Sequence, residues 1–458
     1  MKADVVVIGA GFAGLSAAVR LIDAGLRVVV VEEAPRLGGR ATAFTDRETN
    51  ERVDNGQHVL FGCYRETYAF LRRLGTDALA PLQRRLALTM VGPGGNQSRL
   101  ECPEWPPPWH LVGGALRWNA LPLRDRLTAL RLRSVLNDVR RDGAAAVAAR
   151  VPGDQTVSAW LDANGQSARL SQWLWHPLAI AALNQSPAEA AAAPFVRVLG
   201  ELFGPKVEDS AIGMSSVPLD ELYAEPARHA IESAGGATLK KSPARIQINS
   251  EGSIECVDTG ATRIHTSVVV STVPWHALGR IWHGGPPAAI QPLVEIGASL
   301  GSSPIVTVNL WYDAAVMSEP FIGLIGGPMH WVFDKSAILA SKQKGGHLSI
   351  VASGAVELAA MDNAAVTAAA MRQLETSLPE TARARLLRSV VVREHRATFS
   401  LAPGGPARPP AMTALRGFYL AGDWTDTGLP GTIEGAVRSG HTAAELVIRD
   451  ARTRQPRS

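Results

Sequence analysis

The clearest pattern of hydrophobic and polar positions lies near the start of the chain. Residues 5 to 8 form a continuous apolar, β-branched run, which predicts a parallel strand buried on both faces. Apolar residues then recur at helical spacing from 15 to 22, and a second apolar run at 28 to 31 predicts another buried strand. The order strand, helix, strand predicts a parallel unit of about 30 residues.

Three further regions have a readable pattern. Residues 235 to 278 alternate between apolar and polar positions with turn signals between them, which predicts short strands that end in a buried strand at 268 to 273. Near the end of the chain, residues 418 to 421 predict a last buried strand, and residues 431 to 436 begin a helix.

Residues 121 to 141 are rich in arginine and leucine and predict helix with two apolar faces rather than one. One face carries Leu123, Leu127 and Leu130, and the nearly opposite face carries Leu132, Val135, Leu136 and Val139. This arrangement does not match the single apolar face of a helix that lies in a membrane surface.

The turn between the first strand and the first helix has the spacing G-x-G-x-x-G, with Gly9, Gly11 and Gly14, and Glu32 ends the second strand. The first glycine permits a tight turn, the second lets a pyrophosphate approach the backbone, and the third lets helix and strand pack closely. Free N–H groups at the helix N-terminus then face the anion, and Glu32 accepts hydrogen bonds from ribose hydroxyls. The unit therefore predicts a dinucleotide site.

Composition narrows the class of protein. The chain has 458 residues, 46% hydrophobic and 19% charged, which excludes a disordered chain, and it has no uncharged apolar run long enough to span a bilayer. The net charge is +4, but no stretch combines clustered Lys and Arg with a known nucleic-acid-binding motif, so no nucleic-acid partner is expected. We expect two or three domains in a soluble globular protein.

The compartment is predicted from the N-terminus and the cysteines. Asp4 and the glycine spacing argue against a signal peptide at the apolar start. Cys63, Cys102 and Cys256 are odd in number and widely spaced, which predicts buried thiols in a reducing compartment and no metal site. We expect a cytoplasmic protein.

The stretch EEAPRLGGR follows the second strand and places Gly38, Gly39 and Arg40 shortly after Glu32. With the first motif, this stretch resembles the N-terminal signature of the flavin amine oxidase and phytoene desaturase superfamily, in which the cofactor is FAD. The resemblance implies an α/β fold, α+β overall, with a Rossmann-like FAD-binding domain made of discontinuous segments and a mixed α/β substrate-binding domain. We assign residues 1–75, 215–300 and 385–458 to the first domain, and residues 76–214 and 301–384 to the second.

The same resemblance implies further contacts to FAD. Gly56 lies in the stretch DNGQH, and Gly422 and Asp423 follow the last strand, where the family places an Asp near the ribityl and pyrophosphate end. Thr432 and Ile433 open the last helix, whose N-terminus points at the N1/O2 edge of the flavin in the family. The positive end of that helix dipole would stabilise the anion that forms on reduction.

Longer stretches resemble the bacterial squalene-associated FAD enzymes, the hydroxysqualene dehydroxylases. They are residues 53–75, 182–199 and 329–336 and the run 417–441. This resemblance implies reductive removal of the hydroxyl of hydroxysqualene to give squalene, in the route feeding hopanoids. A carotenoid or other isoprenoid desaturase is the alternative. An amine oxidase is less favoured. Amine oxidases of this fold usually carry a lysine on a strand that enters the substrate domain, and the corresponding stretch here, residues 301–312, contains no lysine. A non-enzymatic lipid-binding protein remains a third class.

The chemistry of dehydroxylation requires reduced flavin, a proton donor and an apolar active-site wall that keeps water away from the cation. Because the hydroxyl is allylic, its departure as water leaves a delocalised cation, which hydride from N5 of reduced FAD quenches. Candidate donors are Asp334, Asp426 and His58, and each also has an ordinary structural interpretation, as a turn, loop-capping or hydrogen-bonded residue. No second G-x-G-x-x-G is present for NAD(P)H, so the electron donor stays open.

Two partners are suggested by the segments between the motifs. Apolar stretches such as WLWHPLAIAALN favour a hydrophobic, isoprenoid substrate. Trp105, Trp109 and Trp118 lie beside several arginines, which suits a lipid headgroup region and predicts peripheral contact with the inner face of the membrane. Two packed helices with solvated arginines explain the same neighbourhood equally well.

Overall fold

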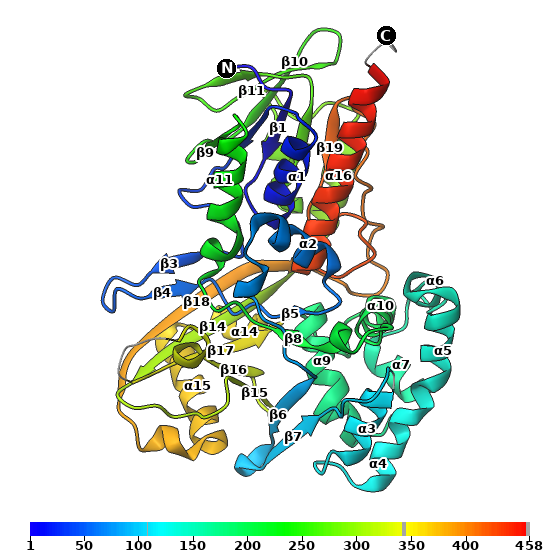
Figure 1. Cartoon of the computed structure of the whole chain (residues 1–458), viewed down its shortest axis with the longest axis vertical. Helices are drawn as coiled ribbons and strands as arrows, with labels where there is room; N and C mark the ends of the chain where they lie inside the picture. The colour runs from blue at the N-terminus through cyan, green and yellow to red at the C-terminus, as the bar shows by residue number, and fades with distance from the viewer. Residues whose placement is uncertain (108, 341–344, 455–458) are drawn as a thin grey trace.

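The computed structural model describes residues 1–107, 109–340 and 345–454, and Figure 1 shows two lobes stacked along the long axis. The upper lobe is built on a five-stranded sheet, and the lower lobe on a seven-stranded sheet with a group of helices beside it. Cys63, Cys102 and Cys256 are buried free thiols, as the cysteine pattern predicts.

The five-stranded sheet is parallel throughout. Its order is β19 (Phe418–Leu420), β13 (Val269–Ser271), β1 (Val5–Ile8), β2 (Val28–Val31) and β9 (Ala237–Leu239). The first strand, helix and second strand therefore form as predicted, and the later strands join them from distant parts of the chain.

Both faces of this sheet are covered, which explains why its strands are apolar at every position. Val5 and Val7 pack against one core cluster, whereas Val6 and Ile8 pack against the other. The first face carries α1 (Phe12–Asp23), α11 (Glu225–Ser233) and α16 (Ile433–Arg454), which lie side by side in Figure 1. The second face carries β10 (Arg245–Ile248), β11 (Ile254–Asp258), β12 (Arg263–His265), the 3₁₀ turn Trp275–Arg280 and α12 (Gln291–Ser299).

The seven-stranded sheet is mostly antiparallel, with one parallel pair between its fifth and sixth strands. Its order is β18 (Leu386–Phe399), β14 (Ser302–Tyr312), β17 (Gly346–Ser353), β16 (Trp331–Asp334), β15 (Phe321–Leu324), β6 (Ala87–Val91) and β7 (Gln97–Glu101). One face packs against α14 (Val356–Ala360) and α15 (Asn363–Ser377).

The helices beside this sheet come mainly from one continuous stretch of the chain. They are α3 (Trp109–Arg117), α4 (Leu123–Thr128), α5 (Arg133–Asp142), α6 (Ala144–Ala148), α7 (Val157–Ala163), α9 (His176–Leu183) and α10 (Ala192–Leu202). Between α4 and α5 the chain makes a 3₁₀ turn, so the predicted helix at 121–141 is broken into short pieces.

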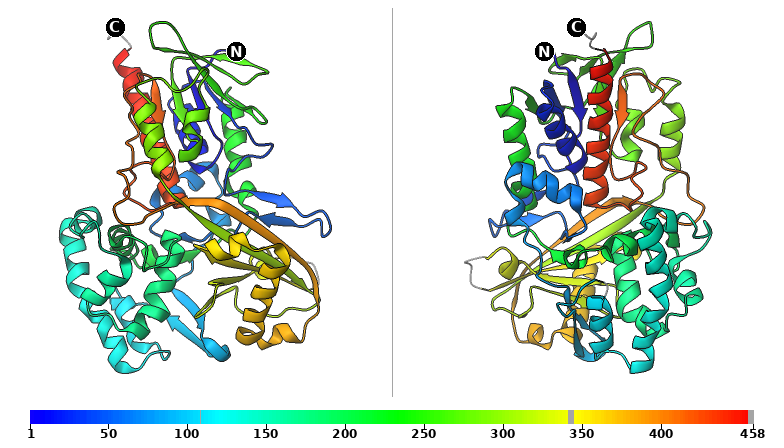
Figure 2. Two further views of the ribbon diagram at one scale, coloured as in Figure 1. Left: turned by 180° about the vertical axis from the view of Figure 1, so that it is seen from behind. Right: turned by 45° about the vertical axis from the view of Figure 1, so that its right-hand side comes forward.

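The strand β18 shifts one of the predicted domain boundaries. It lies in the segment 385–458 that was assigned to the FAD-binding domain, yet it pairs with β14 as the edge strand of the other sheet. Figure 2 shows it as a long curved strand passing between the two lobes. We propose that the third FAD-binding segment begins after Phe399.

Candidate functional site

The glycine turn at the end of β1 has the close packing that its spacing predicts. Gly9 has φ +104°, which side chains rarely adopt, and a Cβ on Gly14 would lie 2.0 Å from the Gly9 carbonyl oxygen. At Gly11, a Cβ would meet only Gly38 and Gly39, both at 3.9 Å. The backbone beside Gly11 is therefore open to a ligand, as a dinucleotide pyrophosphate requires.

Glu32 is fixed at the end of β2 by the backbone. Its two carboxylate oxygens accept hydrogen bonds from Ala10 N and Ala34 N, each at 2.8 Å. Burial raises the pKa of Glu32, and the hydrogen bonds from these backbone N–H groups act in the opposite direction. Each oxygen retains a lone pair, so the carboxylate can still accept from ribose hydroxyls.

Arg40 connects the loop after β2 with the end of β19. Its guanidinium donates to Asp423 Oδ1 at 2.6 Å and to the Ala397 carbonyl at 2.6 Å. The pairing of Arg40 with Asp423 brings two of the predicted FAD residues together. The glycine turn, Glu32 and this pair lie outside the carboxyl ends of the parallel strands, where dinucleotides bind in such sheets. The residues present therefore fit FAD.

The Arg40–Asp423 pair gives a testable expectation for cofactor binding. Asp423→Asn removes the buried charge that faces the half-buried Arg40 guanidinium, so we expect the purified protein to retain less than about a tenth of the wild-type flavin. The measurement is flavin absorbance per protein after gel filtration. Asp426→Asn is the matched control, because Asp426 is exposed in the same loop and should leave flavin content unchanged. Equal flavin content in Asp423→Asn and the wild type would contradict the expectation.

A cavity of about 1120 Å³ begins beside these residues and extends into the lower lobe. At the upper end it is lined by Arg40, Gly56, His58, Thr432 and Ile433, all predicted from the sequence. Apolar side chains from the seven-stranded sheet and the helices form most of the remaining wall, among them Phe61, Leu88, Trp173, Leu178, Phe321 and Phe333. Such a wall suits a long apolar molecule.

The strand β14 contributes Ile305 and Thr307 to this wall, and no lysine lines the cavity within the described ranges. The lysine Lys335 is buried just outside the lining, with 3% of its side chain exposed. Its Nζ donates to Asp54 Oδ2 at 2.9 Å and to Gln57 Oε1 at 2.7 Å, and Gln57 itself lines the cavity. The sequence did not reveal this ion pair.

Two of the three predicted proton donors lie away from the cavity, and the prediction is corrected for both. The Asp334 carboxylate accepts from Ala337 N at 3.1 Å and caps the short helix α13 (Lys335–Ile338). Burial raises the pKa of Asp334, but a helix cap outside the lining cannot reach a substrate there. Asp426 is exposed to solvent and does not belong to the residues described along the cavity.

His58 is the predicted donor that lines the cavity. Its Nδ1 lies 3.2 Å from the Gly56 carbonyl oxygen, which can only accept, so Nδ1 carries a proton and Nε2 of the neutral ring does not. Burial lowers the pKa of His58, while the nearby Asp54 carboxylate opposes that shift. At neutral pH the ring is therefore an acceptor at Nε2, and it becomes an acid only after taking up a proton.

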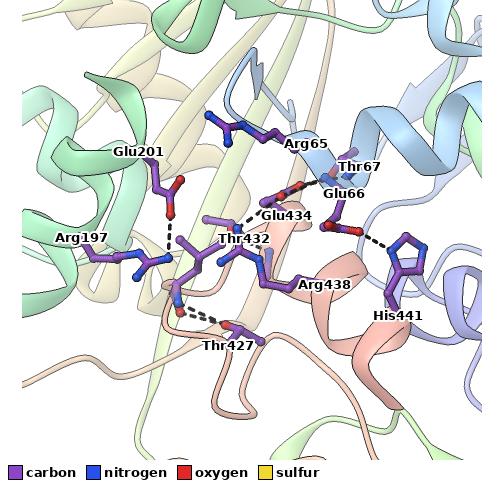
Figure 3. A network of polar contacts seen from close by, with 12 residues as sticks. Arg65, Glu66, Thr67, Arg197, Glu201, Thr427, Thr432, Glu434, Arg438 and His441 are labelled. Atoms are coloured by element: carbon purple, nitrogen blue, oxygen red, sulfur yellow. Dashed lines mark hydrogen bonds and ion pairs between the residues drawn. The ribbon is translucent and has the colours of Figure 1, made fainter. Parts of the chain in front are cut away.

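Figure 3 shows a polar network around the start of α16 that the sequence analysis missed. Arg197 and Glu201 form an i, i+4 pair on α10, with Arg197 Nη2 donating to Glu201 Oε1 at 2.7 Å, and they point toward Thr432. The spacing was visible in the sequence, but i, i+4 pairs of opposite charge are common on helices. Only the fold shows that Glu201 lines the cavity.

Glu434 lies in the first turn of α16 and is nearly fully buried. Its carboxylate accepts from Glu66 N at 3.1 Å and from Thr67 N at 2.9 Å, at the first turn of α2 (Arg65–Leu74). Thr67 Oγ1 donates to the same carboxylate at 2.8 Å. The start of α16, which the family resemblance places at the flavin, is thus held to α2 by three hydrogen bonds.

Comparison with known proteins places the chain among flavin-dependent enzymes, in agreement with a site that fits FAD. The model of the flavin containing amine oxidoreductase family matches residues 12–448. The chain is 29% identical to a hydroxysqualene dehydroxylase of Sinorhizobium fredii, over 99% of this chain and 100% of that protein. It is 30% identical to a protein of the same name from Rhodopseudomonas palustris, over 98% of this chain and 99% of that one.

More distant proteins share the fold. A 15-cis-phytoene desaturase of Narcissus pseudonarcissus is 25% identical over 98% of this chain and 80% of its own length. The solved structure of a cyclohexylamine oxidase from Brevibacterium oxydans has a TM-score of 0.70 at 18% identity, covering 99% of this chain and 100% of that one. The predicted α/β fold with its Rossmann-like cofactor domain is confirmed by this likeness.

Proposed function

This chain belongs to the flavin-containing amine oxidoreductase family, and we propose that within it the chain acts as a hydroxysqualene dehydroxylase. It is an FAD-dependent oxidoreductase, and its reaction is the reductive dehydroxylation of hydroxysqualene to squalene. The observation that carries this function is similarity to two proteins of that name over nearly the whole length of both chains. The long apolar cavity agrees with an isoprenoid substrate.

The reaction balances as one C–O bond broken and one C–H bond formed. A proton joins the leaving hydroxyl, which departs as water, and a hydride fills the allylic carbon that remains. FAD, when bound in its reduced form, supplies that hydride. The chain must therefore hold the cofactor, orient the substrate, deliver a proton and keep bulk water from the allylic cation.

The position of each residue indicates which of these tasks it performs. The glycine turn, Glu32 and the Arg40–Asp423 pair hold the cofactor, and Thr432 and Ile433 present the N-terminus of α16 at the upper end of the cavity. Apolar walls from the seven-stranded sheet and the helices beside it exclude water around the isoprenoid chain. We assign the proton at the leaving oxygen to His58, because it alone of the three predicted donors lines the cavity.

The direct test is single-turnover chemistry under anaerobic conditions. We expect holoenzyme reduced with dithionite to convert hydroxysqualene to squalene, measured by gas chromatography of the lipid extract, with one squalene formed per flavin. Unreacted hydroxysqualene in the presence of fully reduced, bound flavin would refute the function.

The protonation state of His58 determines how we expect the single-turnover rate to depend on pH. The His58 pKa lies below its ordinary value of 6.5, so the protonated ring is populated only on the acid side of that value. We expect the single-turnover rate to rise as pH falls and to level off below the lowered pKa. His58→Gln should reduce the rate about 100-fold and abolish the pH dependence. A wild-type rate and profile in this variant would remove His58 from the mechanism, whereas flavin content serves as the folding control.

A desaturase is the second candidate, and the likeness to a phytoene desaturase is the observation that favours it. A desaturase removes hydride from an isoprenoid, so oxidised holoenzyme mixed anaerobically with phytoene or squalene would lose its flavin colour. We expect no bleaching with either hydrocarbon. Bleaching together with an absence of squalene formation would select this alternative.

The proposed location is the cytoplasm, with peripheral contact at the inner face of the membrane. Among the described residues, no helix combines the length and apolarity that crossing a membrane requires. A water-insoluble substrate supports the peripheral contact. The electron donor is proposed to bind without a second G-x-G-x-x-G turn, because the chain carries one such motif.

A further inference from the structure

Exposed apolar side chains gather on one small part of the surface. Five of the ten large hydrophobic residues that are exposed in the described chain come from residues 105 to 130. They are Trp105 (43% exposed), Trp109 (58%), Leu123 (62%), Leu127 (47%) and Leu130 (40%), and we call them the outer patch. The outer patch belongs to α3, α4 and the turns around them, at the end of the lower lobe farthest from the five-stranded sheet in Figure 1.

Packing explains which of the two apolar faces of this segment remains outside. Leu132 is 2% exposed, and Val135 and Val139 pack against the core. The opposite face, with Leu123, Leu127 and Leu130 at i, i+4 and i+7, has no such cover and faces outward. The exposed face is thus a regular apolar stripe rather than scattered residues, which marks an interaction surface.

The outer patch is continuous with the cavity. Trp109 and Leu130 both belong to the patch and line the cavity, whose other end reaches His58 and Thr432. Leu116 of α3, Leu132 of the 3₁₀ turn and Leu136 of α5 add further apolar side chains to the cavity wall. An apolar molecule held against the patch would therefore reach the cavity along side chains that belong to both.

The segment that carries the patch is positively charged. Residues 105 to 141 contain seven arginines and two aspartates, an excess of five positive charges, whereas the whole chain has a net charge of +4. Arg117, Arg124, Arg131, Arg133 and Arg140 are exposed, and Asp125 is buried. Arg133 and Arg140 line the cavity as well. Tryptophan, leucine and arginine in one exposed area match an anionic lipid surface.

We propose that the outer patch docks on an anionic phospholipid bilayer and that the isoprenoid substrate enters the cavity directly from that bilayer. The inference rests on the proposed function for the identity of the substrate, and it adds the surface, the orientation and the charge of the lipid. The five-stranded sheet then faces away from the membrane, and the cavity runs from the lipid surface to the flavin end. A second copy of the chain on the same patch is the competing occupant, but the arginines would repel their own copies there.

The test uses FAD-loaded full-length protein and sedimentation with vesicles of phosphatidylcholine alone or mixed with phosphatidylglycerol. We expect binding to the mixed vesicles that weakens at high salt, and at least tenfold weaker binding for Leu123→Ser/Leu127→Ser, whose residues lie in the patch but not in the cavity wall. The matched control is Val356→Ser/Leu387→Ser, two exposed apolar residues elsewhere, which should bind like the wild type.

Activity separates this inference from the proposed function. With hydroxysqualene dispersed in detergent, Leu123→Ser/Leu127→Ser should react like the wild type, and with hydroxysqualene in mixed vesicles it should react at least tenfold more slowly. Equal vesicle binding by this variant and the wild type would overturn the inference. Sedimentation of the wild type as a dimer that this variant dissociates would also overturn it, in favour of the second copy. Vesicle binding without turnover in either medium would refute the dehydroxylase function but would still support the outer patch as the docking surface.

Discussion

Purified Gly14→Ala protein should carry no bound flavin. The added Cβ would lie 2.0 Å from the Gly9 carbonyl oxygen and 2.8 Å from Thr272 Oγ1. Gly9 cannot move away, because its N–H donates to the Val31 carbonyl at 2.8 Å and its carbonyl oxygen accepts from Thr272 Oγ1 at 3.2 Å. The helix α1 must therefore move away from β1, at a cost of about 3 kcal/mol or more. The dinucleotide turn is lost with that movement.

Flavin absorbance per protein and the Tm of the purified protein measure this effect. Gly153→Ala is the matched control, since a Cβ there meets nothing within 4 Å and the same substitution should leave both quantities unchanged. A Gly14→Ala protein with full flavin content would mean that the turn tolerates the extra carbon, and the assignment of Gly14 to helix–strand packing would be wrong.

Lys335→Met should lower the stability of the holoenzyme by about 3 to 5 kcal/mol, because it leaves the Asp54 carboxylate buried without its counter-charge. The side chains of Lys335 and Asp54 are 3% and 7% exposed, so water cannot replace the ammonium group. Gln57 loses the partner of its Oε1 at the same time, while its Nε2 still donates to the His58 carbonyl at 3.1 Å.

Thermal unfolding followed by circular dichroism measures the loss, and we expect the Tm to fall by at least about 5 °C. The double variant Asp54→Asn/Lys335→Met is the matched control. It removes both charges and keeps an oxygen that can accept from Leu219 N, so it should recover more than half of the lost stability. Equal losses in the single and double variants would show that the buried charge is not the cause.

The parts of the site that the sequence predicts are those encoded locally. Gly9, Gly11 and Gly14 are separated by a few positions, and the turn they make depends on backbone sterics within one strand and one helix. The same holds for the parallel strands, whose continuous apolar runs reflect burial on both faces. These features needed no knowledge of distant residues.

The parts that the sequence does not predict depend on contacts across hundreds of positions. Lys335 and Asp54 are 281 positions apart, and no spacing rule connects them. Asp334 and His58 looked equivalent as proton donors, and only the fold separates a helix cap from a cavity wall. For residues 121 to 141 the two apolar faces were visible, but which one is buried depends on the helices that pack against it.

The order of strands in the five-stranded sheet has a consequence for synthesis on the ribosome. β1 pairs with β13, about 260 positions later, and β13 pairs with β19, which ends at Leu420. At translation rates of about 5 to 20 residues per second, the nascent chain exposes an unpaired, fully apolar strand edge for tens of seconds. Such an edge is prone to aggregate, so we expect soluble yield in cells to depend on chaperone capacity. Asp423 and the start of α16 follow β19 in the chain, so the cofactor can be fully held only after both have been synthesised.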